Sequence, residues 1–457
     1  MPRSSNVGLL DTDLLDVAER IVGLAGAGEQ VEVFVGRGHH TDVKVFDGAI
    51  ESFSSADTQG VGVRVVSGGR QGFAYAASLE DDVIAETLAE ARDNAGFGTV
   101  DEFLGLASPD GVAPVDLDLF RPELADFPAE RKIELALELE RAVRASDPRI
   151  RGVESAEYGD STSESAIAST QGVRASTRRT VCSIVASALA GEGSETQTGS
   201  GYSVARTPDE LDMAKAVRDA SEKATRLLGA RKPASRRLTV LLDPPVAASF
   251  LGLLSSGLSA SSVIKGRSLF GGREGEAVAV PFLSLVDDPT EPQAWGSGRY
   301  DAEGLASRRN VLIDGGVLRG FLHNTYTARR CGQASNASAV RGGYRSTPGA
   351  GSRALSLTPG DRSQEQLLAD VGDGLLVQSV TGLHSGANPV SGDFSVGVNG
   401  LMVRDGAPAE PIREATIAST LQRMLLDLVA VGADVDWLPG GAAGMTLVIG
   451  DVQLSGS

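Results

Sequence analysis

Between residues 31 and 76, apolar and polar residues alternate in short segments that are separated by residues typical of tight turns. The segments are VEVFV (31–35), DVKVF (42–46), IESF (50–53), VGVRVV (61–66) and GFAYA (72–76). Alternation with a period of two is typical of a strand with one buried face. Turns at Asp47-Gly48, Gln59-Gly60 and Gly68-Gly69 are short enough to join antiparallel strands. The region therefore predicts an antiparallel meander, and because 56 of the 457 residues are glycine, similar turns are expected elsewhere.

Helical periodicity and changes in composition divide the chain into three units. We expect an N-terminal α+β domain at 1–115, a central α+β domain at 123–230 and a C-terminal β-rich domain at 238–457. The Pro- and Asp-containing stretch 105–122 is a predicted linker. The predicted helices span 11–26, 80–95, 128–146, 207–228, 246–259, 363–371 and 414–431. The expected fold class is therefore α+β and multi-domain, with largely antiparallel sheets and flanking helices.

Strands of the C-terminal domain are expected at 238–242, 278–286, 310–314, 317–322, 375–380, 394–403 and 445–454. A hairpin turn is predicted at Asp314-Gly315. The stretch TQGV occurs twice, at 58–61 and 170–173, and both copies are interpreted as hairpin turns rather than as a repeat.

The charge and cysteine content of the chain limit the classes of binding partner and the cellular location that we expect. Forty-two Lys and Arg against 60 Asp and Glu give a net charge of −18, which argues against binding to nucleic acid or to an anionic membrane surface. No apolar run reaches the roughly 18 residues of a membrane-spanning helix. Cys182 and Cys331 are the two cysteines, so a disulfide framework is excluded and a cytoplasmic protein is expected.

Common catalytic signatures are missing. The sequence has no G-x-G-x-x-G opening a helix, no Gly-Lys pair for a phosphate-binding loop and no G-x-S-x-G nucleophile elbow. Its four histidines, His39, His40, His323 and His384, belong to no zinc-binding helix motif, and there is no C-x-x-C. Zinc bound by this chain alone is therefore not expected.

Two regions of the C-terminal unit have residues that a simple turn does not explain. The first, 299–332, places Asp301 and Glu303 beside Gly304 and contains a polar run from His323 to Arg330.

His39-His40 is interpreted as a surface turn, and both cysteines are interpreted as structural.

The second region, 382–400, crowds Gly, Ser and Asn around one His and one Asp between two strand-like segments. Small side chains and backbone donors in such a loop are suited to lining a cleft. The candidate lining residues for substrate binding are His384, Ser385, Asn388, Ser391 and Asp393. A solvated loop is the structural alternative. A hydrolase that uses His384 and Ser385 without a metal is a further reading.

Three quoted stretches, taken in order, resemble the TldD/PmbA family of modulator-of-gyrase and metallopeptidase proteins. They are VKVFDGAIESFSSADTQGVGVRVVSGGRQGFAYAASL, YDAEGLASRRNVLIDGGVLRGFLHNTYTAR and GLHSGANPVSGDFSVGVNGLMVRDGAPAEPIREATIAS. The resemblance runs from about residue 30 to the C-terminus, and the last stretch looks like the PmbA (TldE) branch.

The resemblance implies a two-subunit peptidase. TldD-type chains of the family carry a His-Glu-x-x-x-His zinc helix, but the matching stretch 240–262 has no His, Glu or Cys. The implied function is the non-zinc subunit of a heterodimeric metallopeptidase that cleaves unfolded or extended peptides. Zinc would come from a TldD-like paralogue, with no cofactor in this chain.

Two points remain open at this stage. A peptide-binding or scaffolding protein without protease activity is the alternative from another class. The stretch 331–349 departs from the family's usual pattern after the TAR segment, and this departure points to a specialised peptide substrate.

Overall fold

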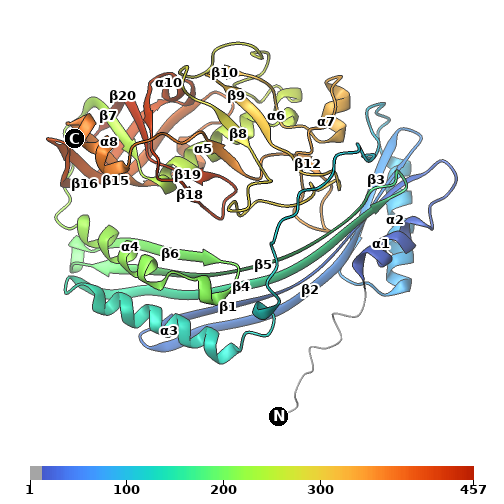
Figure 1. Ribbon diagram of the computed structural model, residues 1–457, viewed down its shortest axis with the longest axis horizontal. Coiled ribbons are helices and arrows are strands. Elements are labelled where there is room, and N and C mark those ends of the chain that lie inside the picture. The colour runs from blue at the N-terminus through green and yellow to red at the C-terminus, as the bar shows by residue number, and fades with distance from the viewer. Residues whose placement is uncertain (1–12, 457) are drawn as a thin grey trace.

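The computed structural model describes residues 13–456. Predictions on residues 1–12, at the start of the first helix and of the domain 1–115, lie outside the described residues. The first half of the chain forms one long, curved six-stranded sheet in the order β3-β2-β1-β4-β5-β6, in which all neighbours are antiparallel (Figure 1). Its strands are β1 (Gln30–Phe46), β2 (Ala49–Ser67), β3 (Arg70–Ala76), β4 (Ile150–Ser169), β5 (Arg174–Ala190) and β6 (Gln197–Ala205).

Four helices cover one face of this sheet in two pairs. The pairs are α1 (Leu14–Val22) with α2 (Asp81–Phe97), and α3 (Ala129–Ser146) with α4 (Met213–Arg226). Along β1 the odd-numbered valines, Val31 to Val35 at one end and Val43 to Val45 at the other, are buried against the two pairs respectively. Since alternate side chains of a strand share a face, both helix pairs lie on the same side. Figure 1 shows the pairs at opposite ends of the long strands.

The C-terminal half packs over the other face of the long sheet. Its main sheet has the order β16-β15-β14-β7-β20-β17, with β14 parallel to β7. These strands are β7 (Arg236–Leu242), β14 (Gly374–Thr381), β15 (Asp393–Arg404), β16 (Ala407–Thr420), β17 (Leu428–Val431) and β20 (Leu447–Ser455).

Smaller elements complete this half. The strands are β8 (Leu285–Asp287), β9 (Asn310–Asp314), β10 (Val317–Leu318), β11 (Ala339–Val340), β12 (Gly349–Ala350), β13 (Leu355–Leu357), β18 (Asp436–Trp437) and β19 (Ala443–Gly444). The helices are α5 (Pro244–Leu258), α6 (Ala260–Ile264), α7 (Thr325–Arg330), α8 (Gln364–Val371), α9 (Leu383–Gly386) and α10 (Leu421–Leu426). A large apolar core joins α5 to both sheets of this half.

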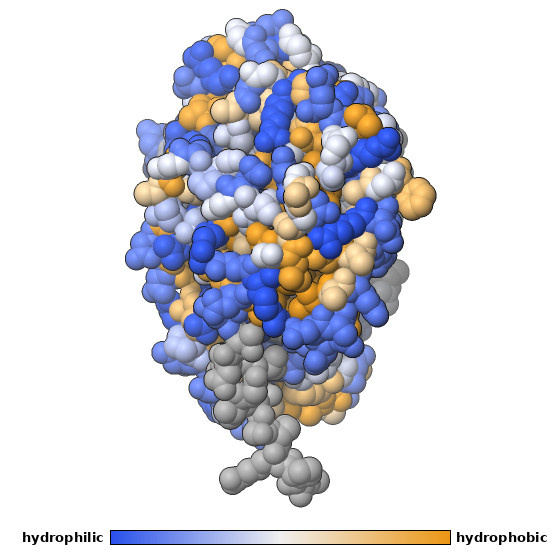
Figure 2. All heavy atoms as spheres, turned by 90° about the vertical axis from the view of Figure 1, so that its right-hand side faces the viewer, coloured by the Kyte–Doolittle hydropathy of each residue, from blue (hydrophilic) through white to orange (hydrophobic). Residues whose placement is uncertain are grey.

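The expected α+β class, with largely antiparallel sheets and flanking helices, is confirmed. Because β1 pairs with both β2 and β4, strands from the ranges 1–115 and 123–230 share one sheet. No helix within residues 13–456 is both long and apolar enough to cross a membrane. Figure 2 shows the end of the molecule near α2 and α7, where hydrophilic side chains surround small apolar areas.

The predicted turn at Gln59-Gly60, and with it the first TQGV hairpin, is wrong. The segments 50–53 and 61–66 belong to one continuous strand, β2. Gly60 instead permits close packing, since a Cβ there would lie 2.4 Å from the ring of Tyr344. The turns at Asp47-Gly48 and Gly68-Gly69 are confirmed, as is the β9–β10 hairpin through Gly315.

The helix predicted over 414–431 is also wrong. Residues up to Thr420 belong to β16, which pairs with β15 and, at Thr416–Ala418, with β20. A helix is confined to α10, and β17 follows it. The spacing of apolar residues in this segment is compatible with either a helix or a strand. The segment forms a strand because it pairs with two other strands.

Part of β2 forms an open edge of the long sheet. The strand β3 pairs with β2 over Val61–Ser67, so within the described residues the segment 49–60 is paired on one side only, with β1. Its side chains are mostly exposed, including Ile50 at 48% and Phe53 at 45%. The segment contains no Pro, Lys or Arg. An open edge of this length offers unpaired backbone groups to another strand.

Candidate functional site

A buried charged cluster joins the long sheet to the C-terminal half. Glu32 on β1 lies opposite Arg64 on β2, and Arg64 Nη2 donates to Glu32 Oε2 at 2.5 Å. The other Glu32 oxygen, Oε1, accepts from Arg341 Nη2 at 2.6 Å. Arg64 Nη2 also lies 3.7 Å from Glu303 Oε1. All four side chains are at most 6% exposed, so these charges are removed from water.

The two carboxyl groups of the cluster differ in ionisation. Burial alone would raise the pKa of Glu32, but Arg64 and Arg341 outweigh it and hold that pKa below its usual range. Burial raises the pKa of Glu303, and the attraction of Arg64 does not offset this. Ionisation is therefore favoured at Glu32 and disfavoured at Glu303, relative to an ordinary glutamate.

Asp301 and Glu303, which the sequence analysis singled out, hold a buried turn. Asp301 Oδ1 accepts the backbone N–H groups of Glu303 and Leu305, and its Oδ2 accepts that of Ala339. Glu303 Oε2 accepts both the backbone N–H and the hydroxyl of Thr325. Glu303 therefore holds the start of α7, and Asp301 holds the turn that carries Glu303.

The polar run from His323 to Arg330 is the helix α7 with its cap. Asn324 and Thr327 form a reciprocal capping box at its N-terminus. The ring of His323 is buried, neither of its nitrogens has a partner among the described residues, and burial lowers its pKa. Tyr326 donates its hydroxyl hydrogen to Asp101 Oδ2.

A cavity of about 500 Å³ lies beside the charged cluster, between the long sheet and the C-terminal half. It is bounded by β2 and β3, by the segment 104–105, by the end of α6, by α7 and by residues 347–349. The last of these belong to the stretch 331–349, which therefore forms one wall.

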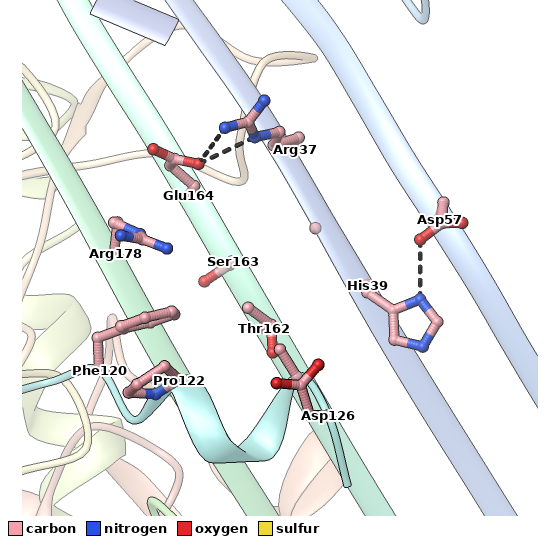
Figure 3. A pocket seen from close by; sticks show the side chains of 12 residues that line it. Arg37, His39, Asp57, Phe120, Pro122, Asp126, Thr162, Ser163, Glu164 and Arg178 are labelled. Carbon is pink, nitrogen blue, oxygen red and sulfur yellow. Dashed lines mark hydrogen bonds and ion pairs between the residues drawn. The ribbon is translucent and has the colours of Figure 1, made fainter. Parts of the chain in front are cut away.

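A second cavity, of about 260 Å³, lies on the helix-covered face of the sheet, near its middle (Figure 3). Arg37 makes two hydrogen bonds to Glu164 Oε2, at 2.6 and 2.9 Å, and the Arg178 guanidinium stacks 4.0 Å from the Phe120 ring centre. His39 Nδ1 lies 2.8 Å from Asp57 Oδ1. The surface turn predicted for His39-His40 is wrong, because both residues lie within β1. Charges of both signs line this cavity.

The His39 ring also has hydroxyl neighbours. Its Nε2 lies 3.3 Å from both Ser55 Oγ and Thr41 Oγ1. An Asp–His–Ser order is thus present, with His39 on β1 and both Ser55 and Asp57 on the adjacent strand β2.

The predicted substrate-binding residues lie together on an exposed loop. His384 and Ser385 are in the short helix α9, and Ser385 Oγ donates to the Gly382 carbonyl oxygen rather than to His384. Asn388 Oδ1 accepts backbone N–H groups of residues 390 and 391, and Ser391 Oγ donates to Asp393 Oδ2 at 2.6 Å. All five side chains are exposed, and none lines the two cavities above. Their role in a cleft stays a prediction.

The stretch 240–262 does not fit a zinc ion. It comprises the end of β7, the helix α5 and α6, and α5 buries Val246, Phe250, Leu251 and Leu254 in the C-terminal core. Its one carboxyl group, Asp243, receives a hydrogen bond from Gln364 Nε2, and burial raises its pKa. Within residues 13–456 no group of three or more His, Cys, Asp and Glu side chains is placed to hold a metal.

The sequence and the fold of this chain are similar to those of known proteins. Residues 31–95, 122–228 and 235–456 match PmbA/TldA metallopeptidase domain 1, central domain and C-terminal domain, respectively. Metalloprotease PmbA of Escherichia coli O157:H7 is 27% identical over 418 residues, covering 90% of this chain and 89% of that protein.

Solved structures agree in fold. A Thermotoga maritima protein, solved as a candidate modulator of DNA gyrase, superposes with a TM-score of 0.88 at 25% identity, covering 96% of this chain and 99% of that one. TldE of Thermococcus kodakarensis superposes with a TM-score of 0.85 at 21% identity, covering 97% and 99%. The TldD/PmbA-like architecture expected from the sequence is confirmed, and the chain belongs to the PmbA/TldD metallopeptidase family, in which it fits the PmbA/TldE branch.

Proposed function

We propose that this chain is the non-zinc-binding subunit of a heterodimeric metallopeptidase that cleaves unfolded or extended peptides. The observation that carries the proposal is the apolar helix α5. The resemblance puts a zinc helix at this place in TldD-type chains, and here the helix has no His, Glu or Cys and buries mainly apolar side chains in the core. Zinc, and the water it activates, would come from a His-Glu-x-x-x-His paralogue.

The open edge of β2 supports association with another chain. Residues 49–60 present unpaired backbone groups together with exposed Ile50 and Phe53. The segment has two acidic side chains, Glu51 and Asp57, and no basic one. A second copy would bring the same charges, whereas a different chain with a basic edge would complement them.

Within this proposal the loop 382–396 lines the shared cleft, with His384 and Asn388 facing the peptide. Their exposure and the lack of an ion pair on His384 among the described residues are compatible with a contact supplied by substrate or partner. Substitution of His384 or Asn388 that leaves cleavage by the assembled pair unchanged would contradict this role. We also propose a cytoplasmic location, since Cys182 and Cys331 are both free thiols.

The test is hydrolysis of an unstructured peptide by this chain alone, by the paralogue alone and by the mixture, each with and without chelator. We expect cleavage in the mixture and its loss with chelator. Chelator-resistant cleavage by this chain alone would overturn the proposal and favour the metal-independent hydrolase.

The second candidate is a peptide-binding or scaffolding protein without protease activity. The absence of zinc ligands in 240–262 is equally compatible with it. Peptide binding by the isolated chain, together with no cleavage in the mixture, would favour this candidate over the split peptidase.

A further inference from the structure

The cavity between the long sheet and the C-terminal half has an unusual charge for this protein. The whole chain carries a net charge of −18, yet the cavity is lined by Arg64, Lys265 and Arg330, and no Asp or Glu is among its lining residues. Its other polar lining side chains are neutral: Gln71, Ser261, Asn324, Tyr326, Thr327 and Thr347. A cavity that concentrates positive charge in an acidic protein favours an anionic ligand.

Arg64 keeps hydrogen-bonding capacity that the protein does not use. Its side chain is 6% exposed, and Nη2 is the nitrogen that contacts Glu32 and Glu303. Nε is buried without a partner, and Nη1 makes no hydrogen bond with the described residues. A guanidinium that is almost fully buried and incompletely satisfied is costly unless another group completes it.

The other two cationic side chains of the cavity, Lys265 and Arg330, differ in how far other residues already engage them. Lys265 is exposed at the end of α6 and makes no ion pair with the described residues. Arg330 Nη1 donates to the Tyr326 hydroxyl at 2.9 Å and lies 3.9 Å from Asp101 Oδ2. Lys265 therefore brings to the cavity a charge that makes no ion pair with the described residues, whereas Arg330 is partly engaged by Tyr326 and Asp101.

The geometry suits a carboxylate better than a phosphate. Phosphate sites commonly use free backbone N–H groups at a helix N-terminus. At α7 two of the three N–H groups of the first turn are occupied, that of Thr327 by Asn324 and that of Thr325 by Glu303. What remains are two guanidinium groups and one ammonium group that can bind a carboxylate, and the amide side chains of Gln71 and Asn324, which can pair with a peptide backbone.

We propose that this cavity binds the carboxylate group of a peptide. The inference rests on the proposed function in one respect, that the ligand is a peptide substrate or product. Its volume of about 500 Å³ admits the end of a peptide chain rather than an isolated small ion. The carboxylate can come from the C-terminus or from an Asp or Glu side chain.

The test is calorimetric titration of the full chain with three peptides of otherwise identical, uncharged sequence. One has a free C-terminal carboxylate, one is amidated, and one is amidated but contains a single Glu. We expect at least tenfold tighter binding of one or both carboxylate peptides than of the neutral one, weakening with added salt. Comparison of the two carboxylate peptides identifies the source of the group.

Matched variants locate the site. Lys265→Gln and Arg330→Gln are expected to weaken carboxylate binding about three- to tenfold, because each removes one lining charge. Arg267→Gln is the control, since Arg267 is exposed near Lys265 but does not line the cavity. Arg64 is left unchanged because its substitution would disturb the buried cluster.

Equal affinity for all three peptides would overturn the inference, as would equal weakening by Lys265→Gln and Arg267→Gln. These outcomes are separable from the proposed function, because the titrations use this chain alone and do not measure cleavage. If the mixture cleaves peptides but this chain shows no preference for carboxylate peptides in the titration, the split peptidase is retained and the carboxylate site is rejected. Carboxylate binding without cleavage by the mixture would retain the site and favour the peptide-binding alternative.

Discussion

At the scale of single residues, Gly62 shows how closely the C-terminal half approaches the long sheet. A Cβ at Gly62 would lie 2.2 Å from the backbone oxygen of Tyr344, in the segment that crosses β2. We expect Gly62→Ala to lower the free energy of unfolding by about 1–3 kcal/mol, because backbone must move to admit the methyl group. Urea denaturation followed by circular dichroism measures this change.

The control is Gly252→Ala in α5, where a Cβ would meet nothing within 4 Å. In a helix this substitution is expected to raise stability by about 0.5–1 kcal/mol. Stabilisation by both substitutions would show that the segment around Tyr344 does not rest on the sheet in solution.

Glu303 predicts a specific pH dependence of stability. Burial raises its folded pKa above the ordinary value of 4.5, so the unfolded chain releases this proton at lower pH than the folded chain does. As pH rises between the two pKa values, the wild type therefore loses stability. Glu303→Gln removes this titration and is expected to gain stability relative to wild type across that window. Each unit of pKa difference is worth about 1.4 kcal/mol.

The measurement is the difference in unfolding free energy between Glu303→Gln and wild type at several pH values on both sides of the ordinary glutamate pKa of 4.5. A Glu32→Gln comparison gives the opposite sign. The pKa of Glu32 is lowered, so its contribution to stability is present above the unfolded pKa and is lost as pH falls through the folded one. Equal pH profiles for both variants would contradict the assignment of charge within the cluster.

At the scale of the element, the open edge of β2 can be tested with proline. Neighbouring residues of a strand direct their backbone N–H groups to opposite sides. One of the two variants Ser54→Pro and Ser55→Pro therefore removes an N–H group on the open edge, and the other removes an N–H group that faces β1. The outward substitution is expected to preserve folding but to abolish association with the paralogue. Thermal unfolding and size-exclusion chromatography of the mixture distinguish the two.

Association that survives the folded proline variant would place the contact with the partner elsewhere. This result would leave the proposed peptidase standing, since cleavage by the mixture is measured separately.

The lengths of elements were harder to predict from the sequence than their kinds. Alternation in VEVFV and DVKVF identified strands correctly, but the polar residues between them, including His39 and His40, gave no sign that β1 continues through. These residues continue the strand because β1 is paired on both sides, with β2 and β4. The helix predicted at 414–431 failed for the same reason, since pairing with distant strands is invisible in local periodicity.

The charged cluster was partly predictable. Asp301 and Glu303 stood out because carboxyl groups beside a turn glycine had no evident role in a hairpin. Glu32 and Arg64 did not, because in alternating strands they occupy the positions expected to face solvent. They are buried because the C-terminal half covers that second face, and Arg341, which neutralises Glu32, comes from 309 residues further along the chain.

At the scale of the whole molecule, buried polar contacts join the two halves. Arg179 on β5 donates to the carbonyl oxygens of Trp295 and Ser297, and Arg341 pairs with Glu32. Ile167 and Val173 pack with Leu305 beside them. Leaving a buried charge without any partner costs about 3–5 kcal/mol. Removing Arg341 takes away one of the two cations that contact Glu32 and leaves Arg64, so the expected loss lies below that range.

We therefore expect Arg341→Met to separate the unfolding of the halves, giving two transitions by calorimetry where the wild type gives one. The double variant Glu32→Gln with Arg341→Met also takes the ionised partner from the buried Arg64, and it is expected to be less stable than Arg341→Met alone. An exposed pair provides the control: Arg226 and Glu222 on α4 lie 2.6 Å apart near the surface, and Arg226→Met should change stability by less than about 1 kcal/mol. A loss after Arg341→Met no larger than this would show that the halves are held together by their apolar contacts, with the ion pair contributing little.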